Sequence, residues 1–234
     1  AAGLVGVVYA FPLFWLLRNP ERSADSTAAP LTPARAASEL FGNRNYLLLV
    51  AYFTLPAIAG WVIKDWMPVI LKEQFKLSQG EAGVIAVLYV QIATIGGAVL
   101  GGWLADWWMR RTERGRIYVS AIGMTLFLPA LFGLGNPGTV FLAIVFLILF
   151  GIGWGFFDCN NMPILSQIIR PELRATGYGI MNLVSISCGG FGDWGFGVLK
   201  SQNVPLTLIF GCFTGVALLS LLIVLLIKPP PAKP

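Results

Sequence analysis

The longest nearly uncharged stretch of this chain runs from Ile117 to Ile169, and its only charged residue is Asp158. As a single helix it would extend about 80 Å, whereas the hydrocarbon core of a bilayer is about 30 Å thick. Two spans joined by a turn fit that thickness. The turn is predicted at Gly135-Asn136-Pro137-Gly138, because Gly and Pro supply the backbone angles of a tight reversal and Pro cannot continue a helix.

The composition of the whole chain agrees with a membrane location. Hydrophobic residues make up 56% and charged residues 12%, whereas soluble domains carry about 25% charged residues. So few charges cannot cover a soluble particle, and the bilayer is the expected solvent.

The chain contains no histidine, which excludes catalytic triads and metal centres built on that residue. Its three cysteines lie inside apolar runs without CxxC spacing, so neither a disulfide framework nor a zinc site is indicated. We expect no cofactor and no metal.

Six apolar segments follow residue 44, each near or above the roughly 20 residues that cross a bilayer. They are approximately Asn45–Leu71, Gly80–Ala105, Ile117–Leu134, Thr139–Ile169, Ala175–Leu199 and Val204–Ile227. Helices are expected because backbone polar groups in lipid must be satisfied within a helix or a closed barrel, and these runs lack the alternation of barrel strands. The predicted fold class is therefore all-α, a polytopic membrane protein with a six-helix bundle over residues 45–227.

The flanking segments differ in composition from the spans. Residues 1–17 are apolar but short, without a basic start or a cleavage site, and we expect the end of a preceding helix rather than a signal peptide. Residues 18–44 are rich in Arg, Pro, Ser and Ala, which predicts a solvent-exposed linker whose prolines interrupt any long helix. Residues 228–234 are predicted to form a short tail.

Basic residues alternate from loop to loop in step with the predicted spans. Twelve of the sixteen lie on one side: Arg18, Arg22, Arg35, Arg44, Arg110, Arg111, Arg114, Arg116, Arg170, Arg174, Lys228 and Lys233. The other side carries Lys72, Lys76 and Lys200. The positive-inside rule therefore places the linker, both arginine-rich loops and the C-terminus in the cytoplasm. The same alternation accounts for the net charge of +5 without a nucleic-acid partner.

Asp158 is the sharpest functional candidate, because a charged residue inside a span is costly and is a candidate for function by default. It lies near the middle of its span and shares a helix face with Asn161. A buried carboxyl without a nearby cation suits a proton carrier, whereas one held by an Arg or Lys forms a structural or gating pair. Both interpretations stay open, and Asp158 is the first candidate for protonation.

Lys64 and Asp65 are charged neighbours in the first complete span. They point about 100° apart on a helix, so one is able to face a cavity while the other meets a neighbouring helix. The alternative is that both lie at the outer interface, with Lys64 beside Trp61 and Trp66.

Further polar candidates lie in the second and fifth spans. Gln91 is isolated at the middle of the second, and Asn182, Ser185 and Gly189 form a stripe along the fifth, with Asp193 further outward. These side chains line an aqueous pathway or form hydrogen bonds between helices without a ligand. The third and sixth spans carry no charge, which favours an inner group of four helices and an outer supporting pair.

A short motif connects these observations to a known family. The run Gly102-Trp-Leu-Ala-Asp106-Trp-Trp-Met-Arg110-Arg111 resembles the G-x-x-x-D-(R/K)-x-G-x-(R/K)-(R/K) signature of major facilitator superfamily (MFS) transporters. Trp107 replaces the usual first basic residue and Met109 the usual glycine. The resemblance implies that Gly102 allows close helix contact. It also implies that Asp106 makes a charge-relay contact at a cytoplasmic gate, with Arg110 and Arg111 as its basic companions.

The resemblance covers the chain from the end of a sixth helix through a twelfth, and Arg170-Pro-Glu-Leu-Arg174-Ala-Thr-Gly177 looks like the family's entry to its eleventh helix. It implies the C-terminal half of a transporter whose seventh, eighth, tenth and eleventh helices line the cavity. The implied partner is the N-terminal half of the same protein, because such transporters bind their solute between two halves.

We therefore expect a secondary transporter in the plasma (inner) membrane that works by alternating access, coupled to protons or sodium. The expected solute is small and polar, such as a sugar, sugar acid or organic anion, and Lys64 is the candidate to counter a carboxylate. One alternative is a membrane enzyme, for which the sequence offers no catalytic constellation. Another is a receptor-like or structural protein of transporter fold.

Overall fold

The structure is a computed structural model that describes residues 8–12, 14, 16 and 32–229. The described residues form helices and loops and contain no strand, which confirms the all-α class. The chain divides into two units, Ala1–Arg35 and Ala36–Pro234. The described positions between 8 and 16 are helical, but most of the predicted helix end at 1–17, linker residues 18–31 and tail residues 230–234 lie outside the described residues.

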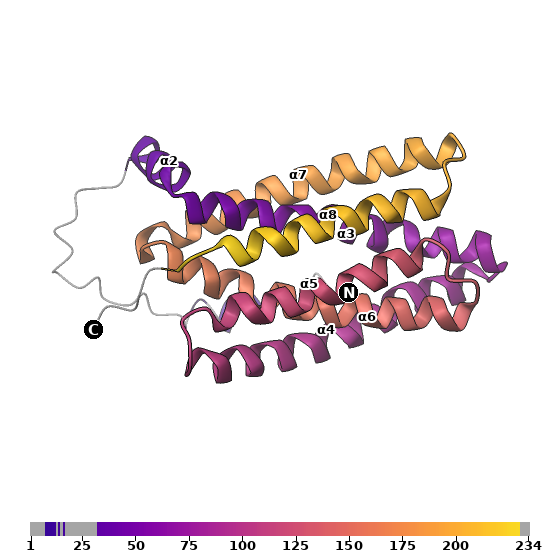
Figure 1. The fold of residues 1–234 in the computed structure, drawn as a ribbon, viewed down its shortest axis with the longest axis horizontal. Helices are drawn as coiled ribbons and strands as arrows, with labels where there is room; N and C mark the ends of the chain where they lie inside the picture. The colour runs from indigo at the N-terminus through magenta and orange to yellow at the C-terminus, as the bar shows by residue number, and fades with distance from the viewer. Residues whose placement is uncertain (1–7, 13, 15, 17–31, 230–234) are drawn as a thin grey trace. The chain divides into compact units, whose positions relative to one another are not determined.

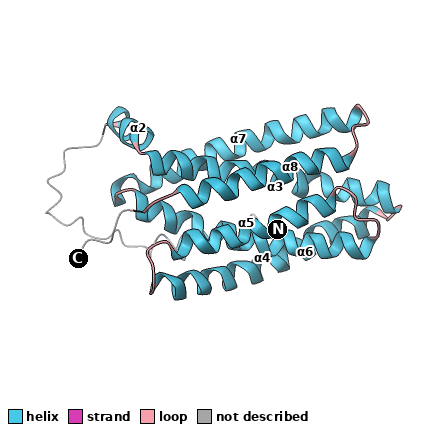
Figure 2. Cartoon of the chain, in the orientation of Figure 1, coloured by secondary structure: helices cyan, strands magenta, loops and turns pink. Residues whose placement is uncertain are grey.

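The second unit contains six long helices among its described residues, joined by short loops (Figures 1 and 2). They are α3 (Arg44–Phe75), α4 (Gln79–Met109), α5 (Gly115–Leu134), α6 (Val140–Ile168), α7 (Arg174–Ser201) and α8 (Leu206–Leu226). A single 3-10 turn, η1 (Pro171–Leu173), precedes α7. Each predicted span therefore corresponds to one helix.

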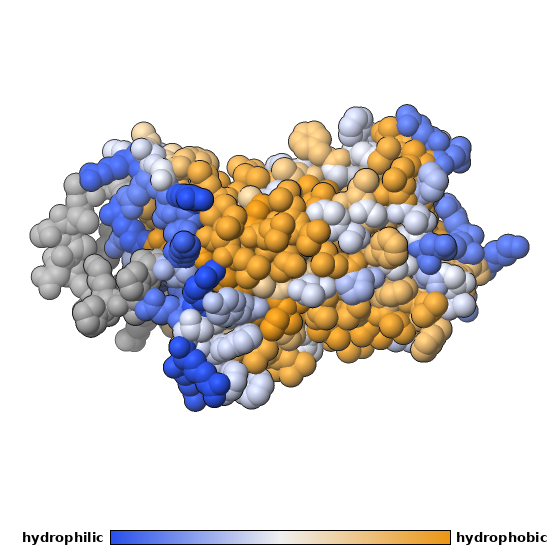
Figure 3. Space-filling view, in the orientation of Figure 1, coloured by the Kyte–Doolittle hydropathy of each residue, from blue (hydrophilic) through white to orange (hydrophobic). Residues whose placement is uncertain are grey.

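Five of these helices, α3, α4, α5, α6 and α8, are long and apolar enough to cross a membrane by length and composition. The 28-residue α7 is long enough but less apolar, because it contains many glycines together with Asn182 and Asp193. On the face seen in Figure 3, apolar side chains form a band across the helices and hydrophilic side chains gather at both ends. This distribution is that of a membrane-embedded bundle.

Local chemistry explains where the helices begin. The side chain of Asn43 accepts hydrogen bonds from two backbone N–H groups at the start of α3, and Ser78 and Glu81 form a capping box at the start of α4. The predicted turn at residues 135–138 is confirmed between α5 and α6. Its Gly138 has φ of 69°, a left-handed conformation that glycine adopts without strain.

Part of the predicted linker forms a helix, α2 (Pro33–Gly42). Pro33 is compatible with it because it occupies the first helical position, where its missing N–H is not needed. Ala36 and Leu40, one turn apart, are buried, so this part of the linker is anchored rather than fully exposed. Glu39 adds an ion pair of 2.7 Å between its Oε2 and Nη2 of Arg170.

The long helices fall into two groups by their contacts with α6 and α3. α6 packs mainly against α4 and α5, α3 packs mainly against α7 and α8, and contacts between α5 and α8 join the groups. Glycines bring α4 and α6 together, since a Cβ at Gly97 would meet the backbone of Ile152 and one at Gly155 would meet the backbones of Thr94 and Ala98. By contrast, α6 makes few contacts with α3 and α7. The boundary between the two groups is therefore the place where a cavity fits.

Most of the basic loops of the second unit meet at one end of the bundle. Asn45 and Lys228 exchange two hydrogen bonds of 2.8 and 3.1 Å, which join the start of α3 to the residues after α8. Arg114 donates to the carbonyl oxygen of Leu225 at 2.5 Å. At the opposite end, Lys200 Nζ lies 2.7 Å from Oε2 of Glu73.

Candidate functional site

A cavity of about 180 Å³ lies at the boundary between the two helix groups. Three of the predicted residues line it, Lys64 from α3, Asp158 from α6 and Asn182 from α7. The other lining residues are Phe53, Ala57, Trp61, Trp154, Phe157, Tyr178, Ser185 and Ile186. The cavity thus combines a cation, a carboxyl group and an amide with aromatic walls, the mixture typical of small-molecule sites.

Lys64 is placed by two tryptophan rings. Its Nζ lies 5.1 Å from the ring centroid of Trp61 on the same helix and 4.7 Å from that of Trp154 on α6. Such cation–π contacts stabilise an ammonium group by about 0.5 to 2 kcal/mol without neutralising its charge. Lys64 also interacts electrostatically with Asp158. It is therefore the cationic partner on which one of the two roles considered for Asp158, the structural or gating pair, depends.

A second cavity, of about 220 Å³, is formed between α3 and α4. It is lined by Lys64, Gln91 and three apolar residues of α4. Gln91 and Asp158 therefore lie in different cavities that share the Lys64 side chain.

Asp65 lines neither of these cavities, in agreement with the expected divergence of neighbouring side chains on a helix. Its electrostatic neighbour is Asp193 of α7, and Oδ1 of Asp193 is shielded from solvent without a hydrogen-bond donor among the described residues. The two aspartates form a pair across the α3–α7 interface and do not line the cavity around Asp158.

The polar residues of α6 and α7 divide between lining and packing roles. Asn182 lines the cavity and its Nδ2 donates to the carbonyl oxygen of Tyr178 at 3.0 Å. Ser185 also lines it, whereas Gly189 packs so closely on the ring of Trp61 that a Cβ there would overlap it. Asn161 is completely buried, and neither amide atom has a hydrogen-bond partner among the described residues.

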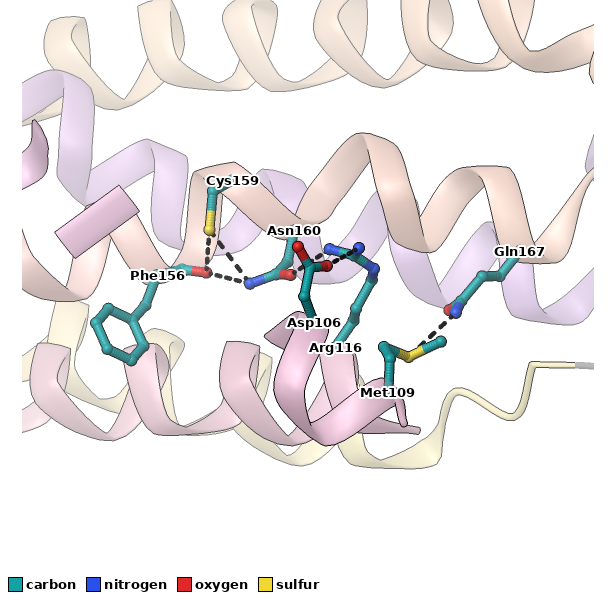
Figure 4. A network of polar contacts seen from close by, with 7 residues as sticks. All are labelled: Asp106, Met109, Arg116, Phe156, Cys159, Asn160 and Gln167. Carbon is teal, nitrogen blue, oxygen red and sulfur yellow. Dashed lines mark hydrogen bonds and ion pairs between the residues drawn. The ribbon is translucent and has the colours of Figure 1, made fainter. Parts of the chain in front are cut away.

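A second polar cluster lies near the basic end of the bundle (Figure 4). Oδ1 of Asp106, at the end of α4, is 2.6 Å from Nη2 of Arg116, at the start of α5. Nη1 of the same arginine donates to Oδ1 of Asn160 on α6 at 3.2 Å. Gln167 Nε2 lies 3.5 Å from the sulfur of Met109 nearby. We call Asp106, Arg116 and Asn160 the gate network, after the role that the family resemblance implies for Asp106.

The partner of Asp106 differs from the expectation. Arg110 and Arg111 were expected as its basic companions, but the guanidinium of Arg111 stacks 4.1 Å above the ring of Trp107 and Arg110 is exposed. Arg116 reaches Asp106 instead, because the turn after α4 folds the start of α5 back beside it. The expected close contact at Gly102 is also absent among the described residues, and Gly101, about 100° away on the helix, packs against Phe156 and Cys159.

Arg116 and Asn160 are the members of this cluster that sequence reasoning missed. Arg116 entered only as one of the charges that set the orientation, although a cation at the start of the helix after Asp106 is a usable signal. Asn160 stands between Asp158 and Asn161 in the sequence but carries no signal of its own.

The family model described as Major Facilitator Superfamily matches residues 1–192. The ectoine/proline transporter ProP of Corynebacterium glutamicum is 27% identical over 149 residues, which are 63% of this chain and 28% of that protein.

Among solved structures, the proton:xylose symporter XylE bound to 6-bromo-6-deoxy-D-glucose matches with a TM-score of 0.56 and 18% identity, over 83% of this chain and 46% of that chain. The inward-open xylose transporter XylE from E. coli matches with a TM-score of 0.54 and 17% identity, over 84% and 48%. At these identities the structures establish the fold alone. The chain spans about half the length of the solved structures and less of the curated relative.

Proposed function

Because the chain belongs to the Major Facilitator Superfamily, we propose that it forms the C-terminal half of a secondary transporter. The transporter moves a small polar solute, such as a sugar, sugar acid or organic anion, by alternating access. Its N-terminal half is the partner that completes the binding site, and the two halves lie together in the bilayer.

The observation that carries this proposal is the cavity that joins Lys64, Asp158 and Asn182 from three helices. Its volume of about 180 Å³ is below the roughly 300 to 1,000 Å³ of complete small-molecule pockets. The smaller volume is consistent with a binding site that a second set of helices completes. The family and the solute site together favour transport over the receptor-like alternative.

Charge in the cavity supports a role for each of its ionisable residues. Lys64 provides a fixed cation for a carboxylate on the solute, and Asn182 a polar group for its hydroxyls. Asp158 interacts electrostatically with Lys64, and its negative charge competes with an anionic solute for that cation. A proton on Asp158 removes this competition and strengthens the attraction of Lys64 for the anion. Proton and solute binding are thereby linked, because each is more favourable when the other has occurred.

The relatives support the class of solute but not its identity. One is named as a transporter of ectoine and proline and another as a symporter of protons and xylose, and these solutes are small and polar. The second name also supports protons over sodium as the coupling ion. We expect the transporter to reside in the plasma (inner) membrane with the basic end of the bundle in the cytoplasm.

Uptake into proteoliposomes tests the function in a full-length transporter that contains this half. Sugars, sugar acids, organic anions and zwitterions are offered under an imposed proton or sodium gradient. We expect gradient-driven accumulation of at least one of them. Absence of flux together with specific binding of a solute would favour the receptor-like alternative.

Asp158→Asn tests the coupling residue. We expect it to abolish accumulation driven by a proton gradient, because the amide cannot carry the proton, while exchange of solute across the membrane continues. Glu73→Gln is the matched control, since Glu73 is an exposed carboxylate on the bundle that pairs with Lys200 away from the cavity. Full gradient-driven uptake by Asp158→Asn contradicts the assignment.

A further inference from the structure

The Arg116 guanidinium contacts two acceptors whose environments differ. Asp106 receives Nη2 at 2.6 Å, and its side chain is 67% exposed. Asn160 receives Nη1 at 3.2 Å and is completely buried. An exposed carboxylate is able to exchange its partner for water, whereas a buried amide oxygen without a donor carries the full cost of desolvation. Asn160 is therefore the permanent partner of Arg116, and Asp106 the exchangeable one.

The Asn160 side chain is itself held in one orientation. Its Nδ2 donates to the carbonyl oxygen of Phe156 at 3.0 Å, one turn earlier on α6, and lies 3.3 Å from the sulfur of Cys159. These contacts leave Oδ1 facing Arg116 (Figure 4). The amide thus presents a fixed acceptor and fixes the direction of the guanidinium.

The helices that carry the two acceptors approach each other closely. A Cβ at Gly101 of α4 would lie 3.0 Å from Cα of Phe156 and 3.2 Å from the sulfur of Cys159, so the end of α4 and this part of α6 approach at backbone distance. Arg116 bridges both from α5. The same short stretch of α6 carries Asp158 toward the cavity and Asn160 toward Arg116.

We propose that Asn160 is a positioning residue of the gate network, whose buried amide aims the Arg116 guanidinium at Asp106. The ion pair at the end of α4 then forms and breaks without reorganising the arginine. This inference rests on the proposed function, because it gives the network a role in the opening and closing of a transporter.

Hydrogen–deuterium exchange of the full-length transporter tests the proposal without a known solute. Asn160→Leu removes the acceptor at nearly constant volume, and Asp106→Asn removes the charged partner. We expect each to raise deuterium uptake in the peptide covering residues 104–117 by about two- to tenfold, the range for the net loss of one ordinary hydrogen bond. The double variant is expected to match Asp106→Asn alone, because without the ion pair there is nothing left to position.

Two further variants keep the test decisive. Arg116→Lys retains the charge but loses the planar fork that serves two acceptors, so it is expected to raise uptake in the same peptide even where Asn160→Leu folds poorly. Ser220→Ala removes another buried hydrogen bond, to the carbonyl oxygen of Tyr52 at 3.0 Å, and is expected to leave residues 104–117 unchanged.

The possible failures are distinguishable. If Asp106→Asn changes neither deuterium uptake nor transport, the gate network has no role and the inference falls with that part of the proposed function. If Asp106→Asn acts but Asn160→Leu does not, or if their effects add, the positioning role alone is wrong. A purely structural Asn160 would raise uptake along the whole of α6 regardless of Asp106.

Discussion

At the scale of single residues, Lys64 sets the electrostatics of the cavity. Two indole rings hold its ammonium group by their faces and leave the positive charge in place, and Asp158 contributes the nearby negative charge. The site is thus nearly neutral in sum but strongly polar within an apolar band. If the cavity binds an anion as proposed, neutralisation of Asp158 is expected to favour that binding.

Lys64→Gln is expected to weaken the binding of an anionic solute by about tenfold or more, since one favourable charge interaction of about 1.4 kcal/mol corresponds to a factor of ten. Binding of a neutral sugar is expected to change less. The KM for uptake into proteoliposomes by the full-length transporter measures the effect. Lys72→Gln, an exposed lysine near the end of the same helix, serves as the control and is expected to leave KM unchanged.

An equal loss for neutral and anionic solutes would contradict the charge-pairing role of Lys64. It would show instead that the lysine shapes the cavity through its contacts with Trp61 and Trp154.

The residues that sequence reasoning found and those it missed differ in kind. Lys64, Asp158 and Asn182 stand out in apolar runs because a polar group inside the membrane is energetically costly and therefore suggests a function. The structure brings the three residues into one cavity. Arg116 lies among several arginines, and which of them reaches Asp106 depends on how the turn after α4 folds. Pairing among equivalent surface charges is a tertiary property that spacing alone does not determine.

At the scale of elements, α4 and α6 form the tightest contact of the bundle. Gly97 and Gly155 lie where the two backbones touch, and small residues permit such an approach between membrane helices. The contact brings together the helices that carry Asp106 and Asn160, the two acceptors of Arg116.

Gly155→Ala is expected to destabilise the protein, because its Cβ would overlap backbone atoms of Thr94 and Ala98. Overpacking of this kind costs about 1 to 3 kcal/mol. Gly96→Ala is the matched control, since no atom lies within 4 Å of its Cβ position and Ala favours the helix. Thermal unfolding of purified protein measures both. A melting temperature for Gly155→Ala equal to that of Gly96→Ala would contradict the backbone contact.

Helix positions followed from the apolar runs, but helix ends did not. α3 continues to Phe75, four residues past the predicted Leu71, because the polar residues after Leu71 extend the helix beyond the apolar band. α2 was missed since its buried face consists of only Ala36 and Leu40, too few for a hydrophobic pattern to stand out from a Pro-rich segment.

At the scale of the whole molecule, α4 and α7 expose large apolar side chains. Trp103 and Val99 on α4 are each 67% exposed, and Phe191 and Trp194 on α7 are 73% and 71% exposed. Lipid or the partner half of the proposed transporter is the expected cover.

The isolated chain is therefore expected to insert into a bilayer without driving solute accumulation, because its cavity has no second wall and no alternate access. Uptake into proteoliposomes containing only this chain, compared with the full-length transporter at equal protein density, measures this. Gradient-driven accumulation by the chain alone would contradict the half-site model.

The separation in sequence between α3 and its partners has a consequence for biosynthesis. α4, α5 and α6 leave the ribosome as neighbours and find one another through short loops. By contrast, the hydroxyl of Tyr46 donates a hydrogen bond to the carbonyl oxygen of Gly177, 131 residues later in the chain. Asn45 likewise donates to the carbonyl oxygen of Lys228, 183 residues later. Until α7 and α8 are synthesised, α3 lacks most of its contacts with the other described helices, and we expect lipid or insertion factors to cover it. Nascent chains that stall before α7 are therefore expected to present α3 without its main protein contacts, and to be the form most open to membrane quality control.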